Sequence, residues 1–159
     1  MQLYILRHGI AENVKPGGND SERVLTAEGK KRLHEILRTV HKAGVSPELI
    51  ISSPYVRAVE TAEIAIEVFG YKESLLKTDV LVPSSEPKAV WEEIRDHKSA
   101  ASVMLVGHEP LLSALAANLL GAPSLYVDMK KAAILRIDIE SFGPQPHGML
   151  KWMLVPKLV

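Results

Sequence analysis

The stretch "SVMLVGHEP", residues 102–110, joins an apolar run to a glycine, a histidine and a proline. An uninterrupted apolar run of this kind is typical of a strand that is buried on both faces, as the strands of parallel sheets are. Both faces of such a sheet must be covered by helices. The stretch therefore predicts a strand over residues 102–106 inside an α/β fold.

Strands and helices alternate along most of the chain, and Gly, Pro and Ser mark the boundaries between them. Thr26 is the expected N-cap of the first helix, and "SP" at 53–54 is expected to supply the N-cap and first residue of the second. We predict strands over 2–6, 48–52, 75–82, 102–106, 131–139 and 148–155, and helices over 26–43, 54–69, 86–97 and 110–120.

This order of elements predicts a three-layer α/β/α sandwich, with residues 1–159 forming one domain around a mainly parallel sheet. The last two predicted strands have no helix between them, and a parallel pair would need such a crossover. One edge of the sheet is therefore expected to be antiparallel.

Composition excludes several classes of function. The 159 residues have zero formal net charge and contain no cysteine. A general nucleic-acid or membrane-surface binder would normally be basic, and disulfides, thiolate metal sites and cysteine nucleophiles all require cysteine. We see no signal peptide and no apolar run of the roughly 18 residues that a membrane span needs. The expected location is the cytoplasm.

Three predicted strands are followed by residues that suit phosphate chemistry. These residues lie at the carboxyl-terminal ends of the strands, where open α/β sheets bind ligands. Arg7, His8 and Gly9 follow the first strand, Arg57 begins the helix after the second, and His108 follows the strand over 102–106. Guanidinium groups bind phosphate oxygens, imidazole can attack phosphorus, and a glycine lets the backbone approach an anion. The combination favours transfer of a phosphoryl group to a histidine.

Each of these residues taken alone would more often be an ordinary surface residue, and only their joint placement favours a site. A metal ion held by His8 and His108 is disfavoured because the neighbouring arginines would repel a cation. The remaining histidines are expected on a helix surface, at a helix end or in a turn: His34, His41, His97 and His147.

The motifs also resemble those of a known family. "LRHGIAE" at 6–12, "SSPYVRAVETAE" at 52–63 and "VGHEP" at 106–110 resemble the histidine phosphatase superfamily, the phosphoglycerate-mutase-like group. The short chain and "ERVLTAEGKKR" at 22–32 are most similar to its SixA-type phosphohistidine phosphatases. The resemblance covers nearly the whole chain.

The resemblance implies that His8 is the nucleophile and forms a phosphohistidine intermediate. Arg7, Arg57 and His108 would surround the phosphoryl group, and Arg23 would extend this pocket. No metal and no organic cofactor is implied. His8 must attack as neutral imidazole, so its other ring nitrogen should donate to a fixed acceptor, for which a backbone carbonyl is suited. His108 would stabilise the phosphoryl oxygens best if it were protonated.

Larger relatives supply an acidic proton donor for an alkoxide leaving group, but the corresponding segment here, "VLVPSSEPKAVWEE" at 80–93, is short. Glu86 is the best candidate donor, although a glutamate at a helix start is also explained by the helix dipole. Glu12 and Glu109 are poorer candidates. The short segment should also leave the pocket open, which suits a phosphorylated residue on a protein surface.

Three functions remain open at this point. The first is hydrolysis of phosphohistidine in a protein, where a weak proton donor is sufficient because imidazole leaves as a neutral ring. The second is hydrolysis of small phosphate monoesters in the same pocket, which requires a working acid such as Glu86. The third is a non-catalytic phosphate-binding module.

Overall fold

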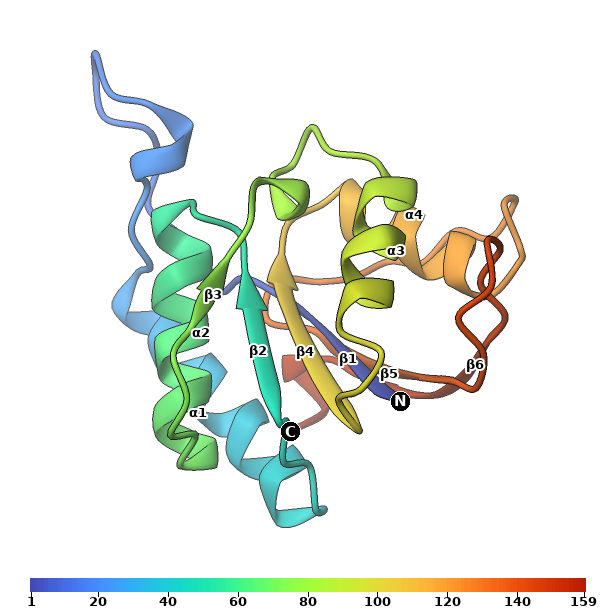
Figure 1. Cartoon of the computed structure of the whole chain (residues 1–159). Coiled ribbons are helices and arrows are strands. Elements are labelled where there is room, and N and C mark those ends of the chain that lie inside the picture. Colours follow the sequence, from blue (N-terminus) through green and yellow to red (C-terminus); the bar gives the residue numbers. More distant parts are fainter.

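The computed structural model describes residues 1–159 and contains a six-stranded mixed sheet (Figure 1). The strand order is β3-β2-β4-β1-β5-β6, and β3, β2, β4 and β1 run parallel, whereas β5 is antiparallel to both of its neighbours. The predicted parallel sheet with one antiparallel edge is confirmed. The strands are β1 (Gln2–Arg7), β2 (Leu49–Ser52), β3 (Leu76–Lys77), β4 (Ser102–Gly107), β5 (Ile134–Ile139) and β6 (Gly148–Leu154).

Four helices cover the two faces of the sheet, with α1 and α2 on one face and α3 and α4 on the other (Figure 1). Alternate residues of a strand point to opposite faces. In β1, Leu3 and Ile5 accordingly pack with α3 and α4, whereas Tyr4 and Leu6 pack with α1 and α2. The helices are α1 (Ala27–Lys42), α2 (Val56–Phe69), α3 (Pro87–Asp96) and α4 (Leu111–Leu119).

Strand β4 lies between β2 and β1, and all six of its residues are buried. The apolar run therefore occupies the place that its sequence predicts. The expected cap of α1 is also present, because the Thr26 side chain accepts a hydrogen bond from the backbone N–H of Gly29 at 3.0 Å. No helix in the structure is both long and apolar enough to cross a bilayer.

The predicted start of the second helix is wrong. Helix α2 begins at Val56 with Tyr55 as its N-cap, so Ser53 and Pro54 lie before it. The reason is that the backbone N–H of Ser53 still donates to the carbonyl of Val106, at 2.9 Å, and extends the pairing of β2 with β4. Ser53 therefore continues the extended strand, its hydroxyl accepts a hydrogen bond from the N–H of Tyr55 at 3.3 Å, and helical backbone begins only after Tyr55.

Two other predicted strands are shorter than expected. The prediction over 75–82 becomes the two-residue edge strand β3, followed by a 3₁₀ turn, η2 (Asp79–Leu81), that buries Leu81 beneath α3. The prediction over 131–139 begins only at Ile134, because Ala132 has a left-handed backbone, with φ of 62°, that interrupts an extended chain.

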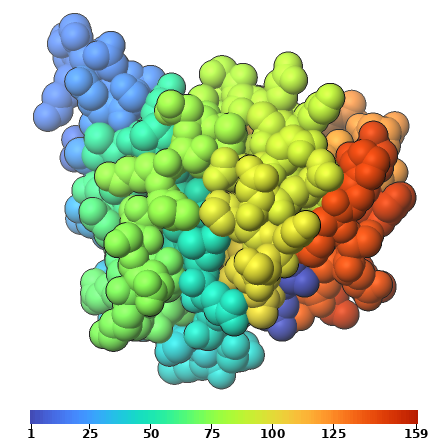
Figure 2. All heavy atoms as spheres, in the orientation of Figure 1, coloured from blue at the N-terminus to red at the C-terminus, as the bar shows by residue number.

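The segment between β1 and α1 extends away from the sheet. A bridge between Ala11 and Leu25 closes its base, and the residues between them rise from the body of the molecule (Figure 2). The segment includes the 3₁₀ turn η1 (Asp20–Glu22). The segment therefore places polar side chains near the carboxyl-terminal ends of the parallel strands.

Candidate active site

His8, Arg57 and His108 meet at the carboxyl-terminal ends of β1 and β4. Arg7 and Gly107 are in register in these neighbouring strands, so the two histidines that follow them lie side by side, with ring centroids 5.0 Å apart. The Nε of Arg57 donates to Nε2 of His8 at 3.2 Å. The structure therefore brings together three residues that are distant in the sequence.

The His8 ring has one nitrogen fixed by the backbone. Its Nδ1 lies 2.7 Å from the carbonyl oxygen of Gly9, and because a carbonyl can only accept, Nδ1 carries the proton. Nε2 then has a lone pair, which accepts the hydrogen bond from Arg57. The backbone acceptor expected from the sequence is the neighbouring carbonyl.

Burial, together with the charges of Arg57, Arg7 and Lys131, lowers the pKa of His8 to about 3, against the opposing effect of the Gly9 hydrogen bond. His8 is therefore neutral near pH 7. A neutral imidazole with a fixed Nδ1 proton presents one nucleophilic nitrogen, Nε2. This is the protonation state that attack on phosphorus requires.

His108 is held by a residue that sequence analysis assigned to a helix start. Its Nε2 lies 2.8 Å from the hydroxyl of Ser53, which the continued strand pairing points toward it. Burial and the charges of His8 and Arg57 lower the pKa of His108 to about 3, with a smaller opposing effect of Asp20. An imidazolium at this position therefore needs an anion beside it.

Two buried polar atoms of the predicted phosphate ligands have no partner. They are Nε of Arg7 and Nδ1 of His108, although Arg7 also donates through Nη1 to the carbonyl of Met129 at 2.6 Å. Buried polar atoms are rarely left unpaired, because each loses its hydrogen bonds to water without compensation. An oxyanion could accept from Arg7 and, once His108 is protonated, from His108.

The guanidinium of Arg57 is held by Asp20, a residue that sequence analysis did not select. Nη1 of Arg57 donates to the Asp20 carbonyl at 2.6 Å, and Nη2 donates to its carboxylate at 2.9 Å. Arg23 binds the other carboxylate oxygen at 3.0 Å. Arg23 is therefore connected to Arg57 through Asp20 and makes no direct contact with His8. The sequence gives no signal for this bridge, because it joins a loop to a distant helix.

Burial alone would raise the pKa of Asp20, but hydrogen bonds and charges from Arg23 and Arg57 outweigh it and lower the pKa below its ordinary value. Asp20 is therefore ionised near neutral pH. Together, Asp20 and Arg57 stand over His8, whose exposure is only 5 %. The site is more enclosed than the short segment after β3 suggests.

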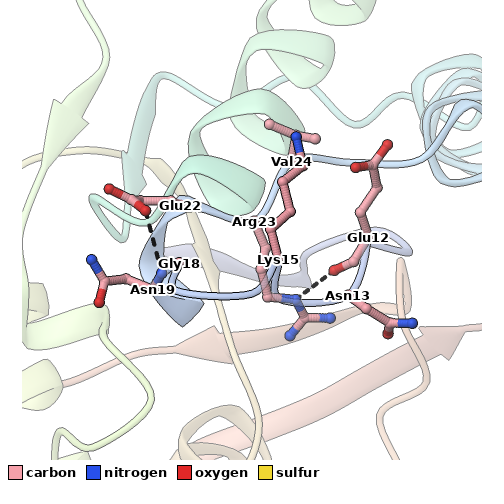
Figure 3. A pocket seen from close by; sticks show the side chains of 8 residues that line it. All are labelled: Glu12, Asn13, Lys15, Gly18, Asn19, Glu22, Arg23 and Val24. Carbon is pink, nitrogen blue, oxygen red and sulfur yellow. Dashed lines mark hydrogen bonds between the residues drawn. The ribbon is translucent and has the colours of Figure 1, made fainter.

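Arg23 also lines a separate cavity in the protruding segment. This cavity has a volume of about 230 Å³, and Nε of Arg23 donates there to the carbonyl of Glu12 at 2.6 Å (Figure 3). Its lining includes neither histidine of the site. It is lined by Glu12, Asn13, Lys15, Gly18, Asn19, Glu22, Arg23 and Val24.

The candidate proton donors lie apart from the cluster or are engaged elsewhere. Glu86 is exposed at the N-cap of α3, and no hydrogen bond or ion pair links it to His8 or His108. Both carboxylate oxygens of Glu109 accept from Ser113, at 3.0 and 2.6 Å, and thereby cap the start of α4. Glu12 is exposed and interacts with Arg23 through its backbone only.

Gly9 is connected to both sides of the site. Its N–H donates to the Thr61 hydroxyl at 3.2 Å, and that hydroxyl donates to the Arg57 carbonyl at 2.7 Å. A Cβ at Gly9 would lie 2.7 Å from Cδ1 of Leu33 in α1. The glycine therefore allows close packing with α1 and places its carbonyl against the His8 ring.

Comparison with known proteins agrees with this geometry. The sequence profile of the "Histidine phosphatase superfamily (branch 1)" matches residues 3–79. An uncharacterized protein of Picosynechococcus sp. is 33% identical over 151 residues, which cover 92% of this chain and 90% of that protein. The chain belongs to the histidine phosphatase superfamily.

SixA proteins are among the matches that span nearly the whole chain. Phosphohistidine phosphatase SixA of Escherichia coli is 26% identical, with 98% of this chain and 94% of that protein covered. A structure of the protein histidine phosphatase SixA complexed with tungstate superposes with a TM-score of 0.87 at 25% identity and covers 99% of each chain. Membership in this superfamily supports phosphatase activity.

Proposed function

We propose that this protein hydrolyses phosphohistidine in another protein, through a phosphohistidine formed on His8 and without a metal ion. The observation that carries the proposal is the fixed His8 ring, with Nδ1 donating to Gly9 and Nε2 directed at the Arg57 guanidinium. Arg7 and Arg57 would repel a metal cation at this position and attract a phosphoryl group. The likeness to SixA supports the same substrate class.

In the first step, the lone pair on His8 Nε2 attacks the phosphorus atom. To reach Nε2, the phosphoryl group must take over the Arg57 Nε–H, which becomes a donor to a phosphoryl oxygen. The N–P bond of the substrate breaks, and its electron pair returns to the substrate imidazole. The His8 ring becomes positively charged, and its Nδ1–H bond to the Gly9 carbonyl stabilises that charge.

In the second step, water attacks the phosphorus atom of phosphorylated His8. The N–P bond breaks, its electron pair returns to Nε2, and His8 is again neutral with its proton on Nδ1. The proton lost by water remains on the phosphate product or passes to solvent. Arg7 and Arg57 hold the phosphoryl oxygens in both steps, and the phosphoryl charge favours the protonated form of His108.

The carboxylates around the site favour an N–P substrate over an alkyl ester. An alkoxide leaving group needs a proton, whereas imidazole protonated on its distal nitrogen leaves as a neutral ring. Asp20 is held ionised by two arginines, Glu109 is bonded through both oxygens to Ser113, and Glu86 is exposed. None of the three is suited to donate a proton to a leaving group at His8.

The test is to incubate the protein with a protein domain bearing ³²P-labelled phosphohistidine and to follow release of the label. Wild-type protein should release it in the presence of EDTA, and quenching in alkali should trap an acid-labile phosphoenzyme. His8→Ala should abolish both, whereas His147→Ala, which changes an exposed histidine, should not. An equally active His8→Ala protein would refute the assignment of the nucleophile.

A second variant distinguishes hydrolysis of small phosphate monoesters from hydrolysis of phosphohistidine. Glu86→Gln should leave release of label from phosphohistidine unchanged. If it sharply slows hydrolysis of an alkyl phosphate that wild-type protein prefers to phosphohistidine, the protein is a phosphomonoesterase with Glu86 as its acid. If wild-type protein binds phosphate but hydrolyses neither phosphohistidine nor the alkyl phosphate, it is a non-catalytic binding module.

A further inference from the structure

A cleft rich in cations lies beside the His8 site. We call it the basic cleft. It has a volume of about 490 Å³, and five of its eight lining residues are Arg or Lys, with no Asp or Glu among them. It is lined by Arg7, Ile10, Arg32, Lys130, Lys131, Val155, Pro156 and Lys157.

The basic cleft adjoins the catalytic site at Arg7. Arg7 lines the cleft and is also one of the predicted phosphate ligands. Its Nη1 bond to Met129 holds the guanidinium against the segment that continues into Lys130 and Lys131. The charge of Lys131 also contributes to lowering the pKa of His8, so this lysine is close enough to act on the site. A molecule bound at His8 can therefore reach into the cleft.

The charge in the basic cleft is only partly neutralised by the protein itself. Arg32 pairs with Glu28 and Lys130 pairs with Asp128, but Lys131 and Lys157 form no ion pair. The whole chain has zero net charge, so this concentration of cations is local. Like charges gathered in one cleft repel one another, and an anionic partner would remove that repulsion.

The side chains of the cleft suit a protein surface better than a small anion. All four cations other than Arg7 are exposed, and they come from three separate segments of the chain. Ile10, Val155 and Pro156 supply apolar surface between them. A small anion would be held by a few buried donors, whereas several exposed cations with apolar neighbours can contact several carboxylates at once.

We propose that the basic cleft binds acidic side chains near the phosphohistidine of the substrate protein. This proposal rests on the proposed function, because it places the phosphohistidine at His8 and its acidic neighbours in the cleft. The cleft then contributes to the choice of substrate and to the rate of association, while the chemistry stays with His8.

The test compares two peptides of equal length, each with one phosphohistidine, flanked by glutamates in one and by glutamines in the other. Phosphorylated imidazole serves as the small substrate. The double variant Lys130→Glu/Lys157→Glu reverses the charge of two exposed lysines that line the cleft. The matched control Lys42→Glu/Lys98→Glu makes the same charge change at two exposed lysines, the last residue of α1 and a residue just after α3, near the amino-terminal ends of the parallel strands.

At low salt, wild-type protein and the control should show kcat/KM about tenfold higher for the glutamate peptide than for the glutamine peptide. The cleft variant should lose this preference, and salt should reduce it in the wild type. All three proteins should hydrolyse phosphorylated imidazole within about twofold of one another, since charge reversal outside the reaction centre leaves the chemistry intact.

Equal rates on the two peptides with wild-type protein would refute docking in the cleft, and so would an equal loss of preference in the control. If the cleft variant loses activity equally on phosphorylated imidazole, the cleft belongs to the catalytic pocket and the docking proposal is wrong. Wild-type protein that hydrolyses alkyl phosphates but none of the N–P substrates would instead overturn the proposed function.

Discussion

Acidification should destabilise this protein through His8 and His108. Both have a folded-state pKa of about 3, whereas an unfolded histidine titrates near 6.5. Between these values the unfolded chain binds two protons that the folded protein does not, so the free energy of unfolding falls as the pH falls. The effect is absent above pH 6.5 and grows as the pH falls toward 3.

The expected magnitude at pH 5 follows from these values. The pH is then about 1.5 units below the unfolded pKa, and each unit corresponds to about 1.4 kcal/mol, so each histidine contributes about 2 kcal/mol of destabilisation. The two together contribute about 4 kcal/mol. That is a large part of the 5–15 kcal/mol by which domains are typically stable, as an order of magnitude.

Urea denaturation at pH 7.5 and pH 5, in a buffer without phosphate or other oxyanions, measures this loss. Wild-type protein should lose about 4 kcal/mol more than His8→Gln/His108→Gln, since glutamine does not titrate. His147→Gln removes an exposed histidine and should behave as the wild type. If the double variant and the wild type lose the same stability, the two histidines are not buried in neutral form, and the protonation state assigned to His8 is wrong.

Two further substitutions test the surroundings of the site. Asp20→Asn keeps the backbone bond to Arg57 but removes the carboxylate that competes for its guanidinium, so inorganic phosphate should bind about tenfold more tightly by calorimetry; weaker binding would show that Asp20 positions Arg57. Gly29→Ala should lower the free energy of unfolding by about 1–3 kcal/mol in urea, despite the better helix propensity of alanine, because its Cβ would clash with the backbone carbonyl oxygen of Ile10. A gain in stability would contradict this packing.

The sequence predicts the centre of the fold better than its edges. Strand β4 is apolar on both faces because helices cover both faces, so its own sequence predicts its burial. The short edge strand β3 has one neighbour, and its two residues are exposed, so its local pattern does not reveal where pairing stops. The Ser-Pro signal at 53–54 fails because pairing of Ser53 with Val106, a contact distant in the sequence, overrides a local preference.

The same distinction applies to the candidate site. His8 and His108 follow buried strands, so predicting the strands places both residues at the same end of the sheet, and the adjacency of β1 and β4 in the structure brings them together. Asp20 lies in an irregular segment, and Lys131 precedes a strand that runs in the opposite direction. Neither has a local pattern that relates it to the strand ends. The proximity of both residues to the site is found only from the three-dimensional structure, which places the loops relative to the sheet.

The enclosure of His8 and the ionised state of Asp20 have one physical consequence for the choice of substrate. Transfer of a phosphoryl group from one imidazole to another breaks one N–P bond and forms another, so the two bonds have similar energies. The site then needs to hold charge and geometry and has no need to supply a proton. This reaction needs no proton from Asp20, which two arginines keep ionised, whereas an alkoxide leaving group would need one. The pair of Arg57 and Asp20 is therefore compatible with an N–P substrate, and an ester substrate would require an acid from elsewhere.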